Sequence, residues 1–84
     1  MPAKNHIDLV VNTLAVLEAL AVSEHGKALR EITQDVGLVK SSVFRILFTL
    51  KEAGYVEQPE ENGVYRLTLK TAGLSRRSRE GAAL

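Results

Sequence analysis

The chain has 84 residues, enough for one small domain with a modest hydrophobic core. Its hydrophobic fraction of 45% is ordinary for a globular protein and too high for a disordered one. The absence of cysteine excludes disulfides and cysteine-ligated zinc, and His6 and His25 are far apart and have no set of partner ligands nearby. We therefore expect neither a metal site nor a cofactor.

The charge is nearly balanced but unevenly distributed. Eleven basic and ten acidic residues give a formal net charge of +1. Residues 64–84 contain five bases and one acid, whereas residues 52–61 contain four acids and no base. The longest apolar run, Leu14 to Val22, is interrupted by Glu18 and is too short to cross a bilayer. Because the N-terminus also lacks the apolar core of a signal peptide, we expect a cytoplasmic protein with no membrane partner.

Two helices are predicted in the first half of the chain. Residues 1–7 are expected to be flexible, and Asp8 can N-cap a helix that ends near Val22. A second helix is predicted from Leu29 to Val36, and Gly37 can adopt the positive φ that ends it. The predicted buried face of the first helix consists of apolar residues at helical spacing: Val10, Leu14, Leu17, Leu20 and Ala21.

A third helix is predicted to begin near Ser41, capped by Lys40 or Ser41, and to end at Gly54. At 100° per residue, its core side collects Val43, Ile46, Leu47 and Leu50. The opposite side presents Ser41, Arg45, Phe48 and Glu52, with Ser42 and Thr49 on one flank and Phe44 on the other.

The exposed side of this helix suits entry into a DNA major groove. Ser41 and Ser42 are short enough for close approach and can donate to phosphates or base acceptors. Arg45 can pair with guanine O6 and N7, and Lys40 suits a phosphate. Alternatively, Ser41 is only a helix cap and Arg45 only a solvated charge. The preceding helix, its glycine turn and the hairpin that follows together favour DNA binding.

Two alternating segments after Gly54, Tyr55–Gln58 and Val64–Leu67, predict a β-hairpin with a turn at residues 59–63. We expect Tyr55 and Tyr65 to face each other across it. The fold class predicted is therefore mainly α with a small β-hairpin: a winged helix-turn-helix with three helices, a two-stranded wing and the start of a linker helix.

The wing is expected to contact DNA through its returning strand. Glu60 and Glu61 at the tip would be repelled by phosphates, so Arg66 is the expected contact. Phe44 and Phe48 are expected to pack beneath a neighbouring helix or the wing, with contact to a sugar or a thymine methyl as the alternative. The basic tail around Arg76, Arg77 and Arg79 is either a DNA backbone anchor or, as we favour, part of a linker helix.

No enzymatic activity is expected. The sequence has no glycine-rich phosphate loop, no cysteine nucleophile and no histidine paired with a carboxylate at a useful spacing. His25 lies beside Glu24 in a predicted loop, where a surface pair is the simpler interpretation.

The segments LAVLEAL (residues 14–20), LREITQDVGLVKSSVFRILFTLKEAGYVEQ (29–58) and YRLTLK (65–70) resemble the N-terminal winged-helix domain of IclR-type transcriptional regulators. The resemblance implies a domain that binds double-stranded operator DNA as part of a homodimer. A small-molecule effector would bind a C-terminal domain that is absent from this chain. A linker helix would join that domain to the winged helix. The implied division is a flexible N-terminus (1–7), a winged helix-turn-helix domain (8–67) and a linker segment (68–84).

By position, the resemblance assigns DNA contacts to the third helix: Lys40, Ser41, Ser42, Phe44, Arg45 and Thr49. Three residues depart from the family pattern. Asn12 replaces a frequent arginine, Ala28 replaces a Ser or Thr cap worth about 1 kcal/mol, and Thr68 replaces a glycine.

A homodimer is expected to form through the first helix, with Leu9, Val11 and Val16 exposed, and through the segment after Leu67. The alternative function is a winged-helix protein-interaction module without specific DNA binding. The near-neutral net charge, the acidic wing and an exposed Phe48 would suit that alternative.

Overall fold

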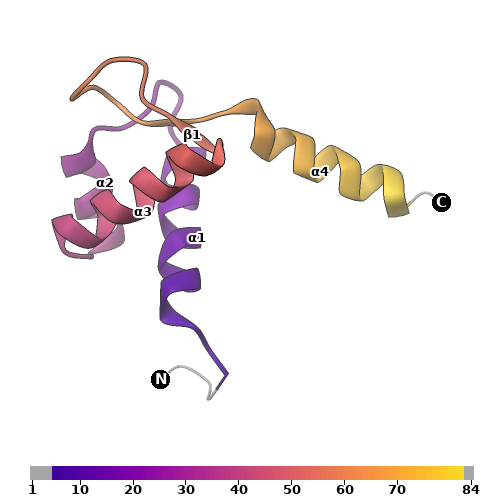
Figure 1. Cartoon of the computed structure of the whole chain (residues 1–84), viewed down its shortest axis with the longest axis horizontal. Coiled ribbons are helices and arrows are strands. Elements are labelled where there is room, and N and C mark those ends of the chain that lie inside the picture. Colours follow the sequence, from indigo (N-terminus) through magenta and orange to yellow (C-terminus); the bar gives the residue numbers. More distant parts are fainter. Residues whose placement is uncertain (1–4, 83–84) are drawn as a thin grey trace.

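The computed structural model of the chain describes the backbone of residues 5–82 and the side chains up to Arg76. In chain order its elements are α1 (Asp8–Ala21), α2 (Leu29–Val36), α3 (Lys40–Ala53), β1 (Val56–Glu57), β2 (Arg66–Leu67) and α4 (Leu69–Ala82). Helices α1, α2 and α3 pack together, the two strands form an antiparallel hairpin above them, and α4 leads away to one side (Figure 1). The predicted fold class, a mainly helical winged helix-turn-helix, is confirmed.

The core is centred on one face of α3. Its four predicted core residues, Val43, Ile46, Leu47 and Leu50, are all buried. They pack with side chains from α1, α2 and the wing: Val16, Leu20, Ile32, Val56 and Tyr65. Each of these elements is too short to be stable alone, so their shared burial is what holds them together.

The predicted buried face of α1 is partly wrong. Val16, expected at a dimer surface, is completely buried, whereas Val10 and Leu14, expected in the core, are about half exposed. Helical spacing could not select the buried side because α1 has apolar residues on more than one side. Moreover, the first half of α1 extends beyond the packed part of the three-helix core (Figure 1), and one of its sides borders the flank of α3. Leu9 and Val11 are exposed, as predicted.

The helix ends differ from the prediction by one residue. Ile7 rather than Asp8 is the N-cap of α1, and Asp8 lies in the first turn, where its carboxylate favourably meets the helix dipole. Val39, with an extended backbone, is the N-cap of α3, so that helix begins at Lys40. As predicted, α2 has no side-chain cap at Ala28.

Glycines end both helices of the helix-turn-helix. Gly37 and Gly54 have φ values of 72° and 88°, in the left-handed region that glycine adopts without steric cost. Gly37 was predicted to end α2 and Gly54 to end α3, and both predictions are confirmed.

The expected pairing of Tyr55 with Tyr65 is wrong. The strands pair Val56 with Leu67, which leaves Tyr55 opposite Thr68. Tyr65 instead pairs with Lys27 before α2, through N–H···O bonds of 2.9 and 2.8 Å in the two directions. The alternating sequence pattern predicted the hairpin, but it could not show that the segment around Lys27 pairs with Tyr65.

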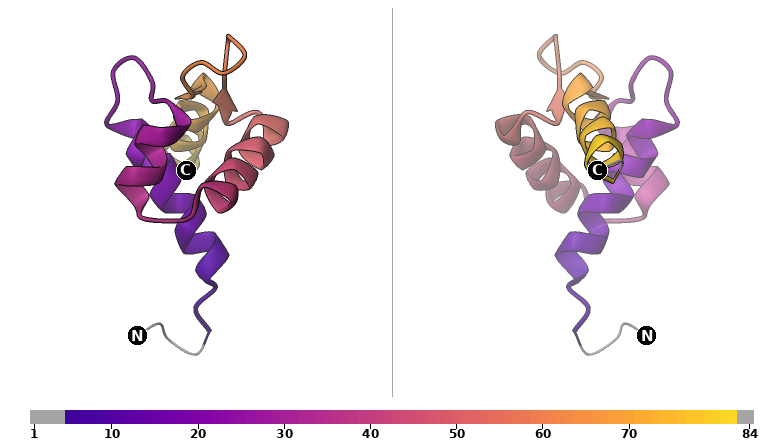
Figure 2. Two further views of the ribbon diagram at one scale, coloured as in Figure 1. Left: turned by 90° about the vertical axis from the view of Figure 1, so that its left-hand side faces the viewer. Right: turned by 90° about the vertical axis from the view of Figure 1, so that its right-hand side faces the viewer.

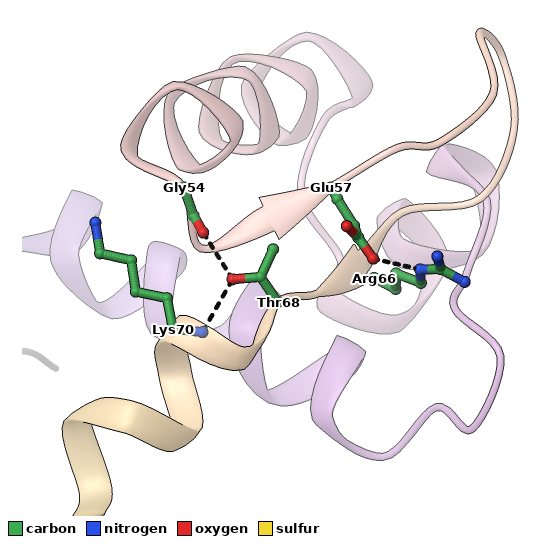
Figure 3. Close-up of polar contacts among 5 residues, drawn as sticks. All are labelled: Gly54, Glu57, Arg66, Thr68 and Lys70. Carbon is green, nitrogen blue, oxygen red and sulfur yellow. Dashed lines mark hydrogen bonds and ion pairs between the residues drawn. The ribbon is translucent and has the colours of Figure 1, made fainter.

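Side-chain hydrogen bonds connect the end of α3 to the start of α4 (Figure 3). The Thr68 hydroxyl donates to the carbonyl of Gly54 at 2.6 Å and accepts the backbone N–H of Lys70 at 3.3 Å, which caps α4. Lys70 Nζ donates to the carbonyl of Ala53 at 2.8 Å and lies 4.7 Å from the centre of the Tyr55 ring. Thr68, noted above as a departure from the family pattern, therefore fixes the exit from the wing.

The N-terminal residues 1–4, within the segment expected to be flexible, and residues 83–84 lie outside the described residues. The division into a domain at 8–67 and a linker segment at 68–84 stays a prediction, although α4 is helical through Ala82. Across residues 5–82, no helix is both long enough and apolar enough to span a membrane.

Gly26 lies against the backbone of Tyr65, so a substitution at Gly26 tests how strongly the wing is held to the segment before α2. Its φ is 91°, and a Cβ at this position would lie 2.7 Å from the carbonyl oxygen of Tyr65. Gly37 has a similar φ of 72°, but a Cβ there would meet nothing within 4 Å. A left-handed backbone costs an L-residue about 1–2 kcal/mol. We expect Gly37→Ala to lower the free energy of unfolding by that amount. Gly26→Ala should lower it by more, because the added Cβ would also clash with the carbonyl oxygen of Tyr65.

Urea denaturation of both variants and the parent chain would measure the difference. Equal losses for the two variants would show that the Lys27–Tyr65 bridge adapts without cost.

Candidate nucleic-acid interface

The outer face of α3 carries most of the predicted contact residues. Because the opposite face is buried, all of them are turned outward and exposed: Lys40, Ser41, Ser42, Phe44, Arg45 and Thr49. Figure 2 shows α3 at the edge of the molecule in both side views, with no other helix or strand outside it. A second molecule can therefore reach the whole length of this face.

One flank of α3 borders α1. Ser42, Arg45 and Thr49 line a hollow of about 280 Å³ together with Asn12 and Thr13 of α1. The Thr49 hydroxyl donates to the carbonyl of Arg45 at 2.8 Å, so only its lone pairs remain available to a ligand. This flank thus combines one cationic side chain and several short polar ones with the apolar residues Leu9, Ile46 and Leu50.

The two cationic side chains of this face are not neutralised. Among the ion pairs of the described side chains, none involves Lys40 or Arg45. Elsewhere, acidic groups do have cationic partners, such as Asp35 with Lys27 and Glu57 with Arg66. Lys40 and Arg45 can therefore interact with an anionic ligand without first breaking an internal pair.

A second hollow brings in residues that the sequence analysis left out of the site. It has a volume of about 490 Å³ and is lined by residues from α2, the start of α3 and the wing: Ala28, Leu29, Arg30, Thr33, Gln34, Lys40 and Asn62. Arg30 and Gln34 lie one turn apart on the exposed side of α2. That spacing was visible in the sequence, but only the fold shows that Lys40 lies beside them.

Arg66 is less available than predicted. Its Nε lies 2.6 Å from Oε2 of Glu57 across the two strands, and both side chains are about half exposed (Figure 3). An exposed ion pair contributes only about 0–1 kcal/mol, so a phosphate could displace Glu57 at small cost. Arg66 as a DNA contact stays a prediction.

The tip of the wing is acidic and tightly turned. Gly63 donates its N–H to the carbonyl of Glu60 at 2.9 Å, and Asn62 has a φ of 64°. Gln58 donates from Nε2 to the carbonyl of Gly63 at 3.1 Å and so holds the returning chain. Glu60 and Glu61 are both exposed, which gives the tip a negative charge.

Phe44 and Phe48 do not pack beneath a neighbouring element, so the favoured interpretation of these residues is wrong. Phe44 is 49% exposed and Phe48 is 55% exposed. Their ring centres lie 6.5 Å apart on one side of α3. The strands are only two residues long, and α4 leads away from α3 (Figure 2), so the wing and α4 offer little surface beneath which the two side chains could pack.

The fold has a counterpart among solved structures. It is similar to the crystal structure of the Zalpha domain from Carassius auratus PKZ in complex with Z-DNA, with a TM-score of 0.67 over 74% of this chain and 100% of that one. At 22% sequence identity, this similarity establishes the winged-helix fold alone.

Sequence comparison gives closer relatives. The chain is 36% identical over 78 residues to the HTH-type transcriptional regulator KdgR of Escherichia coli K12, covering 93% of this chain and 29% of the relative. It is 36% identical over 62 residues to the transcriptional repressor IclR of the same organism, covering 74% and 23% of the two chains. The chain therefore spans less than a third of the length of these relatives. Residues 9–60 match the IclR helix-turn-helix domain, and the protein belongs to the IclR family of transcriptional regulators.

Proposed function

We propose that this chain binds specific operator DNA as a dimer and represses transcription, with α3 in the major groove of each half-site. The observation that carries the proposal is the outer face of α3, where Lys40 and Arg45 stand exposed without internal ion pairs beside Ser41 and Ser42. A helix with this face fits the width of the groove and supplies donors for its acceptors.

Each polar residue of α3 has a separate role in the proposal. Arg45 donates two hydrogen bonds to a guanine, and Ser41 and Ser42 donate to base edges or phosphates. Lys40, with Arg30 across the hollow beside α2, binds the phosphate backbone. Thr49, whose hydroxyl can only accept, meets a base amino group further along the helix. Arg66 binds a phosphate after releasing Glu57.

Relatives named as repressors, IclR itself and the acetate operon repressor of Salmonella typhimurium, support repression as the outcome. A small-molecule effector would act through a separate C-terminal domain beyond these 84 residues, to which α4 is the linker. The protein would have no enzymatic activity of its own and would work in the cytoplasm, where the operator is.

Dimerisation is proposed because a single recognition helix reads few base pairs and the net charge of +1 adds little general attraction. The proposed dimer interface is formed by the first half of α1 and by α4. Apolar side chains are exposed there: Ile7, Leu9, Val10, Val11, Leu14, Leu69 and Leu74. Pairing two copies would bury this surface and place two α3 helices on one DNA.

The first test removes the guanidinium of Arg45. We expect Arg45→Ala to weaken binding to a DNA site selected from a random duplex library, because a bidentate base contact contributes about 1–3 kcal/mol of discrimination. Lys51→Ala is the charge-matched control, since it removes one positive charge from an exposed position at the other end of α3. Gel shifts with competitor DNA would measure both variants.

Equal affinity of Arg45→Ala and the parent chain would contradict the assigned role of Arg45. If the library yielded no enriched sequence, the protein-interaction module, which the exposed Phe44 and Phe48 would suit, would become the better proposal.

A second test concerns dimerisation. We expect the chain to show a concentration-dependent equilibrium between monomer and dimer, and Leu14→Asp to shift it to monomer, because an unpaired carboxylate would be buried in the interface. Analytical ultracentrifugation, alone and with a single half-site, would measure the shift, with Glu24→Gln as a control on an exposed loop. A monomer that saturates one half-site at nanomolar concentration would show that pairing is unnecessary.

A third test concerns the wing. Replacing Glu60 and Glu61 by lysine should tighten binding to any DNA and steepen its salt dependence, by up to about 0.9 log units of affinity per log of salt for each new phosphate contact. Glu18→Lys with Glu24→Lys is the control, because it makes the same change in net charge away from the wing. Salt titrations of both double variants would separate local contact from general charge; identical slopes would show that the wing tip does not approach DNA.

A further inference from the structure

Phe44 and Phe48 form an apolar surface on the same helix as the polar residues of the interface. The two residues are one helical turn apart, so their rings are neighbours on one side of α3. Phe44 and Phe48 are each about half exposed. Exposed aromatic surface gains free energy when a partner removes it from water.

The neighbours of the two rings restrict what that partner can be. Phe44 directly precedes Arg45 and lies within one turn of Lys40 and Ser41 along the helix. A partner that covers the rings therefore also meets exposed cations and a hydroxyl that have no ion pair among the described side chains. A DNA major groove provides phosphates and base acceptors for these groups, and an apolar partner surface does not.

A phenyl ring has no group with which to hydrogen-bond to a base edge. The apolar group that base edges present in the major groove is the C5 methyl of thymine, and phenylalanine is one of the side chains suited to it. The distance between the two ring centres, 6.5 Å, can be compared with the rise along DNA. At about 3.4 Å per base step, the rings span about two steps.

We propose that Phe44 and Phe48 are specificity-determining residues that contact the methyl groups of two thymines about two base steps apart, beside the guanine bound by Arg45. The proposal rests on the DNA-binding function proposed above and adds the class of base read by this side of α3. Glu52, one turn beyond Phe48, is exposed on the same outer side of α3, and its carboxylate would be repelled by phosphates, so we expect the apolar contacts to end at Phe48.

The experiment replaces thymine by uracil, which removes only the methyl group. A site is selected from a random duplex library with the complete 84-residue chain, and each thymine of that site is then replaced singly by deoxyuridine. We expect two positions, about two steps apart, at which the substitution weakens binding about fourfold, the effect of losing one buried methyl-sized group. Substitutions at the other thymines should leave the affinity unchanged.

Two variants connect the effect to the rings. Each variant, Phe44→Ala or Phe48→Ala, should bind equally to thymine and uracil at the position that its missing ring contacted. At the other position, uracil should still weaken binding. Val22→Ala, which trims an exposed apolar side chain at the end of α1, outside the proposed DNA and dimer contacts, is the matched control and should retain both penalties. Thermal melts check that the variants fold, and the uracil scan of the unsubstituted chain requires no variant.

The outcomes separate this inference from the function on which it rests. If no sequence is enriched from the library, specific DNA binding itself fails. If a site is enriched but uracil is tolerated at every position, only the thymine contact is overturned. Penalties that persist in both phenylalanine variants would assign the methyl contacts to another residue. Unchanged DNA affinity in both variants would show that the two rings do not contact DNA and would overturn the inference.

Discussion

Burial of one face of α3 is the constraint on which the rest of the structure depends. Val43, Ile46, Leu47 and Leu50 fix the rotation of this helix about its own axis, because turning it would expose them and bury charged residues. The outward direction of Lys40, Ser41 and Arg45 follows directly from that rotation. The residues that hold the domain together and those offered to a ligand are thus two sides of one helix.

The sequence was sufficient to predict the helix-turn-helix because its signals are local. Gly37 and Gly54 mark helix ends, and Val43, Ile46, Leu47 and Leu50 cluster on one side of α3. The phase of α1 could not be predicted in the same way. Its apolar residues occupy several sides, and which of them is buried depends on how far α2 and α3 extend along it. Val16 and Val10 exchanged their expected positions for that reason.

Predictions that required knowledge of distant partners also failed. Phe44 and Phe48 were expected beneath another element because large apolar side chains usually are buried, but the short strands and the direction of α4 leave them exposed. Arg66 stays a predicted DNA contact, but its ion pair with Glu57 became apparent only from the register of the strands. Arg30 entered the candidate site only when the fold placed it beside Lys40. For the site as for the fold, composition and spacing gave the elements, and tertiary packing decided which side chains meet.

The bridge between Lys27 and Tyr65 has a consequence for the order of folding. Contacts among α1, α2 and α3 join neighbouring elements, whereas this bridge closes a long stretch of chain that contains both α2 and α3. Closing such a loop costs more entropy than forming local contacts and is offset only when the helices are already packed. We therefore expect the wing to dock last and to open first. The two reciprocal hydrogen bonds break together in that opening, so the amide protons of Lys27 and Tyr65 should have one common protection factor against solvent exchange, lower than that of the amides in the middle of α3.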